Sequence, residues 1–155
     1  MLTEAIVIVP YTSVDHEDFR DITKTWVEEY FSLEPFDIAQ LEDPEGTVLN
    51  QGGTILMAKA GGVALGTVGL KYVEEGVYEM IKLGVASSHQ GKGVGRLLSI
   101  AIMDQARLMG GRKLILYSNT KLKAALELYR SLGFVETSLE CGKYLRCDIK
   151  MEIDL

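Results

Sequence analysis

An apolar strand, a glycine-rich loop and an amphipathic helix follow one another directly in the second half of the sequence. The strand is Val77–Val85, the loop is HQGKGVG at 89–95, and apolar residues recur at helical spacing over Val94–Leu108. The next apolar run, Lys113–Tyr117, is a second strand. A strand that follows such a crossover helix lies parallel to the strand before it, so this region predicts a parallel βα unit.

The rest of the chain predicts an antiparallel meander and helices on both faces of a sheet. Strands are expected at Ala5–Val9, Thr54–Ala60, Val63–Val73 and Val77–Val85, with a turn at Gly61-Gly62 and two further strands in the tail around Gly142. Helices are expected at Asp15–Tyr30, which Pro35 ends, at Asp37–Leu41 and at about Lys121 to Leu132, whereas Asp43–Gly53 is expected to be a loop. Gly66 and Gly69 inside a strand indicate a bulge or a close backbone approach. The fold class is therefore α/β (α+β): a three-layer mixed sheet with an antiparallel meander, a parallel βαβα unit and two C-terminal strands.

Length and charge limit the classes of protein. The chain has 155 residues, so we expect a single domain over residues 1–155. A net charge of −6 argues against nucleic-acid binding, and no apolar run is long enough to cross a membrane. An acidic residue stands where a signal peptide needs basic residues, so we expect a cytoplasmic protein.

Charge is distributed unevenly along the chain: residues 1–80 carry 4 Lys/Arg and 15 Asp/Glu, whereas residues 81–155 carry 12 and 7. The basic second half suits an anionic ligand, and the acidic first half suits a cationic partner or a solvated surface.

Cysteine and histidine form neither a nucleophilic nor a metal-binding pattern. Cys141 and Cys147 lack the spacing of metal ligands, and we expect them to be ordinary residues of the C-terminal strands with free thiols. His16 is expected near a helix start and His89 in the glycine loop. We therefore expect no metal site and no covalent acyl-cysteine.

The glycine loop has the composition of a phosphate-binding site. Backbone N–H groups at a helix N-terminus lack helical partners and the helix dipole adds partial positive charge there, so a phosphate can bind. Lys92 and Arg96 add full charges. The loop does not match the G-x-x-x-x-G-K-[ST] pattern of P-loops, and its G-x-G-x-G spacing differs from the dinucleotide fingerprint G-x-G-x-x-G. Gln90–Gly95 fits a third pattern, Q-x-x-G-x-G.

This third pattern resembles the pyrophosphate-binding motif of the GNAT acetyltransferase superfamily. The strand Val77–Val85 ends five residues before Gln90, as it does in that family, and NTKLKAALELYRSLGF at 119–134 resembles the family's second signature segment. The order of the expected elements also matches. The resemblance covers nearly the whole chain; it is most specific over residues 77–134 and weakest over residues 31–53.

The resemblance implies where acetyl-CoA would bind. The cofactor would lie between two splayed parallel strands, Met80–Val85 and Leu114–Tyr117, with its pantetheine amides paired to the backbone of the first strand. The backbone of the glycine loop would hold the pyrophosphate. The residues assigned to the cofactor are Leu83, Val85, Gln90, Gly91, Lys92, Gly93, Val94, Gly95, Arg96, Asn119 and Tyr129.

The resemblance also implies two catalytic residues. Tyr129 matches the tyrosine that protonates the departing thiolate, although its helical spacing equally fits a core tyrosine. Glu79 stands where some family members carry a glutamate base, and strand alternation places it on one face with Ile81, Leu83 and Val85. A glutamate in solvent or in an ion pair is the alternative, and many family members deprotonate the amine through water.

These residues together predict an N-acetyltransferase that moves acetyl from acetyl-CoA to a primary amine of a small molecule or peptide. Attack would be direct, in a ternary complex. The acceptor would enter past the first helix, where Trp26 and Tyr30 are expected to pack in the core, and the acidic first half favours a cationic amine. A homodimer is possible from the resemblance. The alternatives are an acyl-CoA-binding sensor without turnover and an NAD-dependent oxidoreductase.

Overall fold

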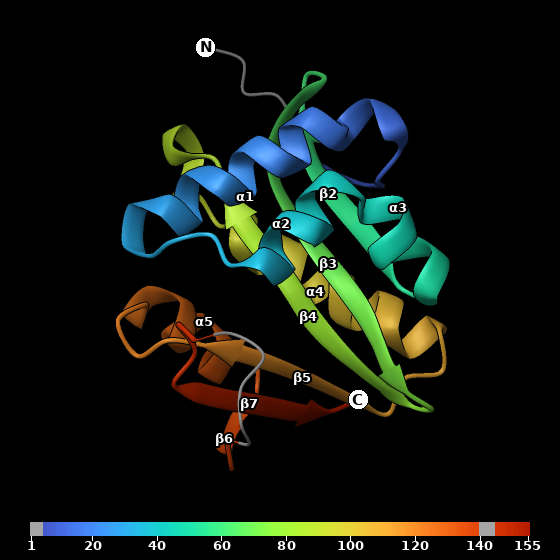
Figure 1. The fold of residues 1–155 in the computed structure, drawn as a ribbon, viewed down its shortest axis with the longest axis vertical. Helices are drawn as coiled ribbons and strands as arrows, with labels where there is room; N and C mark the ends of the chain where they lie inside the picture. The colour runs from blue at the N-terminus through green and yellow to red at the C-terminus, as the bar shows by residue number, and fades with distance from the viewer. Residues whose placement is uncertain (1–4, 140–144) are drawn as a thin grey trace.

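A computed structural model describes residues 5–139 and 145–155 as a seven-stranded mixed sheet covered by helices on both faces (Figure 1). The strands are β1 (Val7–Pro10), β2 (Thr54–Ala60), β3 (Val63–Glu74), β4 (Val77–Val85), β5 (Lys113–Ser118), β6 (Val135–Thr137) and β7 (Ile149–Asp154). The helices are α1 (His16–Tyr30), α2 (Pro35–Glu42), α3 (Pro44–Thr47), α4 (Val94–Leu108) and α5 (Lys123–Ser131).

The sheet runs in the order β1-β2-β3-β4-β5-β7-β6. The pair β4–β5 is parallel, and the other neighbouring pairs are antiparallel. Helix α4 connects the parallel pair and lies behind the sheet in Figure 1, whereas α1 and α2 lie in front of it. The predicted fold class is therefore confirmed: a three-layer mixed sheet with an antiparallel meander, a parallel pair joined by a helix and two C-terminal strands.

Two apolar clusters hold the three layers together. The larger cluster lies between the sheet and helices α4 and α5, and Leu98, Ile102 and Leu114 are fully buried in it. The smaller cluster lies under α1 and α2 and contains Phe19 and Ile81. Each helix buries one face, which is why the apolar spacing of the sequence indicated the long helices well.

The region between the first helix and β2 differs from the expectation. Helix α1 ends at Tyr30, and Pro35 begins α2 rather than ending α1. Proline suits the first turn of a helix because its missing N–H has no helical partner there. The segment expected to be a loop contains α3 and a 3-10 turn at Leu49–Gln51, and Asp43 accepts a hydrogen bond from the Gly46 N–H at the start of α3.

Strand β4 contains a bulge at the position that matters most for the site. Thr67 pairs with Gly84 and Gly69 with Ile81, so β4 has one more residue than β3 over this stretch. Lys82 lies within this bulge and has a φ of +53. This left-handed conformation costs a non-glycine residue about 1–2 kcal/mol. The neighbouring strand approaches closely, because a Cβ added to Gly69 would lie 2.8 Å from the Ile81 side chain.

The bulge reverses the alternation of side chains along β4. Ile81 packs in the cluster under α1 and α2, whereas Leu83 and Val85 pack against the cluster under α4 and α5. The prediction that Glu79 and Ile81 share a face with Leu83 and Val85 is therefore wrong. A two-residue period cannot continue through an extra residue.

The parallel strands separate soon after they meet. Pairing between β4 and β5 covers Val77–Glu79 against Lys113–Ile115, although β4 continues to Val85 and β5 to Ser118. Both strands therefore extend past their last shared pair, with Glu79 at the point where they diverge. Within the described residues, no helix is both long enough and apolar enough to span a bilayer.

Candidate functional site

A cavity of about 460 Å³ occupies the gap between the diverging strands. Its walls come from β4 beyond Glu79, from the end of β5, from the glycine loop, and from one face each of α1 and α5. Residues Arg146 and Cys147, just before β7, complete one end. The gap exposes strand backbone that a linear ligand carrying amide groups could pair with, as an added strand does.

The glycine loop forms one end of this cavity. Gly91 and Gly93 have φ values of +79 and +80, and an added Cβ at either position would meet no heavy atom within 4 Å. Gly93 caps helix α4 without a side chain, so the first N–H groups of the helix point out of the helix end. The left-handed glycines and the uncapped helix end fit an anionic group such as a pyrophosphate.

Most of the predicted cofactor residues meet at the cavity. The members that line it are Leu83, Val85, Gln90, Gly91, Gly93, Val94, Gly95, Arg96, Asn119 and Tyr129. Lys92 is exposed and is not part of the lining. The Arg96 guanidinium donates a 2.9 Å hydrogen bond to Ser131 Oγ on α5, which holds this cation at the mouth of the loop.

Asn119 has its side-chain amide engaged within the protein. Its Nδ2 donates to the Arg146 carbonyl at 2.6 Å, and its Oδ1 accepts from the Lys121 N–H at 2.8 Å. This residue therefore fixes the end of β5 against the segment before β7. Its predicted hydrogen bond to the cofactor stays a prediction, and it would use the second N–H of the amide.

Glu79 and Tyr129 both line the cavity and are both buried. Glu79 is 1% exposed, so the alternative of a glutamate in solvent is wrong. Tyr129 packs in the core with its ring 5.9 Å from that of Phe134, and the same residue borders the cavity. Burial raises the pKa of the Tyr129 phenol, which therefore keeps its proton at neutral pH.

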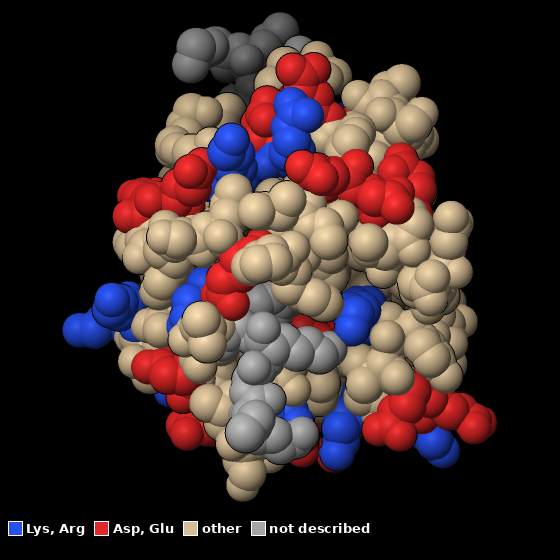
Figure 2. Space-filling view, viewed as in Figure 1, with Lys and Arg blue, Asp and Glu red and all other residues tan. Residues whose placement is uncertain are grey.

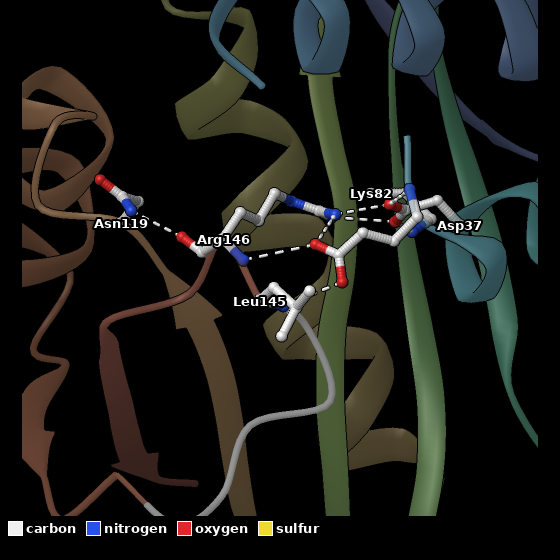
Figure 3. A network of polar contacts seen from close by, with 6 residues as sticks. Asp37, Lys82, Asn119, Leu145 and Arg146 are labelled. Atoms are coloured by element: carbon white, nitrogen blue, oxygen red, sulfur yellow. Dashed lines mark hydrogen bonds and ion pairs between the residues drawn. The ribbon is translucent and has the colours of Figure 1, made fainter. Parts of the chain in front are cut away.

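Four charged side chains, two buried and two partly buried, form a cluster at the end of the cavity near α2 (Figure 3). Asp37 on α2 is fully buried and accepts hydrogen bonds from Lys82 Nζ at 2.6 Å and from both Arg146 Nη atoms. Glu34 accepts from Arg146 Nη1 at 3.2 Å and from the Leu145 N–H at 2.9 Å. The cluster joins α2, the β4 bulge and the segment before β7, and we call it the ion cluster.

The ion cluster sets the charge states of its members. Burial would raise the pKa of Asp37, but hydrogen bonds from Arg146 and the charge of Lys82 outweigh it and hold that pKa below its usual value. Burial holds the pKa of Lys82 below its usual value, although the charge of Asp37 and its hydrogen bond oppose this effect. Burial would also lower the pKa of Arg146, but its bonds to Asp37 raise it. Asp37 and Arg146 are therefore charged at neutral pH, and Asp37 is the main group that favours the charged form of Lys82.

Aromatic side chains and a thiol also line the cavity. Trp26, Tyr30 and Phe31 line it, and a Cβ added to Gly84 would lie 2.7 Å from the Trp26 ring, so the indole rests on bare backbone. Tyr30 is half exposed, so the expectation of a core residue is wrong for it. Cys147 lies before β7 rather than inside a strand, and burial raises the pKa of its thiol to about 11. A protonated thiol is a poor nucleophile.

Comparison with known proteins connects this geometry to a family. The sequence profile of the acetyltransferase (GNAT) family matches residues 16–134. The chain belongs to the GNAT acetyltransferase family.

The GNAT relatives agree in sequence and in fold. The uncharacterized N-acetyltransferase YjgM of Escherichia coli K12 is 32% identical over 80 residues, which are 50% of this chain and 48% of YjgM. A GNAT acetyltransferase of Staphylococcus aureus Mu50 has a TM-score of 0.88 at 20% identity, covering 97% of this chain and 99% of that one. YncA of Salmonella typhimurium, solved with acetyl-CoA, has a TM-score of 0.77 at 21% identity, covering 97% and 94%. The matched segments span about half the length of the first curated relatives, and the two structures show a shared fold.

The ion cluster is the part of this GNAT site that sequence reasoning missed. Asp37 and Arg146 are 109 positions apart, and no local spacing pairs them. Lys82 lies inside an apolar strand, and a charged residue in such a run is the one available signal. Among the described residues, no group of three or more His, Cys, Asp or Glu side chains is placed to hold a metal ion.

Proposed function

We propose that this GNAT protein transfers the acetyl group of acetyl-CoA to a primary amine by direct attack in a ternary complex. The observation that carries the proposal is the gap that opens between β4 and β5 at Glu79 and leads to the glycine loop. A long thin ligand with an anionic end and amide groups fits a cavity of that shape. Acetyl-CoA has both, and when bound it supplies an activated thioester.

The chain's own groups would hold the two ends of the cofactor differently. The N–H groups of Gln90 through Arg96 would bind the pyrophosphate, with Arg96 adding charge from the position that Ser131 fixes. The backbone of Leu83 and Val85 would pair with the pantetheine amides, because β4 is not paired with β5 along this stretch. These contacts would place the thioester beside Glu79 and Tyr129.

Glu79 and Tyr129 would move the protons. An amine that is protonated at neutral pH must lose a proton before it can attack, and Glu79 would accept that proton directly or through a water. Tyr129 would donate its proton to the departing thiolate, and burial keeps the phenol protonated until that thiolate forms. The cavity walls would exclude bulk water from the thioester.

The acceptor end suits an amine attached to an apolar or aromatic body. Trp26, Tyr30 and Phe31 offer an aromatic wall that could contact such a body or a cation. The acidic character of the first half contributes less than its count suggests, because Glu34 and Asp37 are paired with Arg146 and Lys82. Many other acidic side chains of this half lie on the outer surface around α1–α3 (Figure 2).

Calorimetric titration with acetyl-CoA, with NAD and ATP as controls, tests the proposal. We expect selective binding of acetyl-CoA and a large loss of affinity in Gly95→Asp. Gly95 lies in the first turn of α4 with room for a Cβ, the nearest atom being 3.6 Å away, so this change adds a repelling carboxylate without backbone strain. Leu108→Asp adds the same charge at the exposed far end of α4 and serves as the control. Equal affinities for acetyl-CoA and NAD would contradict the proposal.

A further inference from the structure

Lys82 lines the cavity where we propose that the acetyl group binds, and its side chain carries a primary amine. Its side chain is 3% exposed and lines the cavity together with Glu79 and Tyr129. It directly precedes Leu83, whose backbone would pair with the pantetheine arm. The bulge of β4 turns Lys82 to the same side of the sheet as Ile81, where an unbroken strand would turn it away. The protein therefore carries a lysine next to the group that it would transfer to other amines.

Asp37 holds this lysine in an unreactive form. Its carboxylate lies 2.6 Å from Lys82 Nζ and is fully buried, so water does not screen the pair. A charged ammonium has no lone pair with which to attack a carbonyl carbon. The contact also draws the ammonium toward α2, as Figure 3 shows.

We propose that Asp37 protects Lys82 from acetylation by acetyl-CoA in the cavity, and that Lys82 becomes a self-acetylation site when this ion pair is removed. The inference rests on the proposed function, because it requires acetyl-CoA at the splayed strands. It assigns Asp37 on α2 the task of keeping the enzyme from modifying itself.

The chemistry needs no further reactant. The neutral amine of Lys82 would attack the thioester carbonyl carbon, forming the new C–N bond as the C–S bond breaks. The nitrogen loses one proton and the departing CoA thiolate gains one, so the products are N-acetyl-lysine and CoA. Lysine is suited to this reaction because its amine lies on a flexible four-carbon stem that can swing along the cavity wall.

The groups facing Lys82 determine how readily it loses its proton. Asp37 on α2 and Glu79 on β4 favour the ammonium, whereas Arg146 and burial favour the neutral amine. Removing the charge of Asp37 therefore shifts the balance toward the nucleophile. Each unit by which the pKa of a lysine falls raises its free-amine fraction about tenfold, so we expect roughly tenfold or faster acetylation of Lys82 in Asp37→Asn.

Intact-mass and peptide mass spectrometry after incubation with acetyl-CoA, without any acceptor, tests this inference. Asp37→Asn should gain the mass of one acetyl group, located at Lys82, under conditions in which the wild-type protein does not. Asp37→Asn/Lys82→Arg should gain none at this position. Glu34→Gln is the matched control: it removes a carboxylate that binds Arg146 and leaves Asp37 in contact with Lys82.

A second variant guards against loss of folding. Asp37→Asn/Arg146→Gln removes one charge of each sign, so it leaves no guanidinium without its carboxylate, and circular dichroism shows which variants fold. Calorimetry on each variant separates the two proposals. A folded Asp37→Asn or Asp37→Asn/Arg146→Gln protein that binds acetyl-CoA and gains no acetyl group at Lys82 overturns this inference, as does equal acetylation of the wild-type protein. A wild-type protein that does not bind acetyl-CoA overturns the proposed function instead.

Discussion

The two ends of the cavity differ in which groups they present to a ligand. At the glycine-loop end the protein presents mainly main chain: left-handed glycines, a helix end without a side-chain cap and strand backbone beyond the last β4–β5 pair. At the end near α2 it presents the side chains of the ion cluster, contributed by three separate segments. A site made of main chain suits a ligand that is always the same, such as a cofactor. Side chains, in contrast, can be replaced to suit a different ligand without altering the fold.

Because one end uses main chain and the other uses side chains, substitutions should have different effects on cofactor affinity and on stability at the two ends. Main-chain donors depend on the loop conformation, which few residue types permit at φ near +80. Side-chain contacts at the other end join segments that are distant in the sequence. Removing one partner of such a contact should therefore lower the free energy of unfolding. The following predictions test whether stability and cofactor affinity divide between the two ends in this way.

Arg146→Met should have the largest effect on stability. It leaves two carboxylates, those of Asp37 and Glu34, without the guanidinium that binds both, and breaking a buried pair costs about 3–5 kcal/mol. Urea unfolding measures the loss. Arg107→Met is the matched control, because Arg107 pairs with Asp104 on the exposed face of α4 and should contribute below about 1 kcal/mol. Equal losses in the two variants would show that the ion cluster does not stabilise the acceptor end.

Tyr129→Phe should separate chemistry from binding. Removing one hydroxyl leaves the ring packing with Phe134 in place, so we expect acetyl-CoA affinity and folding to change little. Loss of a general acid lowers turnover by about 10²-fold or more. Release of CoA thiol in the presence of a panel of primary amines provides the measurement. A variant as active as the wild-type protein would remove Tyr129 from the mechanism, and equally negligible turnover in both across the panel would favour the sensor alternative.

The same difference explains what could be predicted from the sequence. The loop, α4, β4 and β5 could be predicted because the apolar period of Val94–Leu108 and the spacing of Gly91 and Gly93 act locally on the chain. The ion cluster could not, because its pairing of Asp37 with Arg146 exists only after the sheet has formed. The face of Leu83 was mispredicted for a related reason: the extra residue of the bulge is specified by contacts with β3, not by the residues of β4 alone.

Glu34→Gln should have the smallest effect on stability, and it tests which carboxylate of the ion cluster binds Arg146 more strongly. Glutamine keeps an oxygen that can accept from the Leu145 N–H but loses the charge that binds Arg146, and hydrogen bonds to charged groups contribute about 1.5–3 kcal/mol. Because Asp37 still binds Arg146, we expect a loss of about 1–2 kcal/mol in urea unfolding, clearly less than in Arg146→Met. Glu17→Gln, at an exposed glutamate 3.9 Å from Arg20, controls for the charge change and should hardly change the stability.

A loss of stability in Glu34→Gln as large as in Arg146→Met would mean that Glu34, and not the buried Asp37, is the main partner that holds the segment before β7. Acetyl-CoA affinity unchanged in both variants would then still place the cofactor's binding energy at the opposite, main-chain end of the cavity.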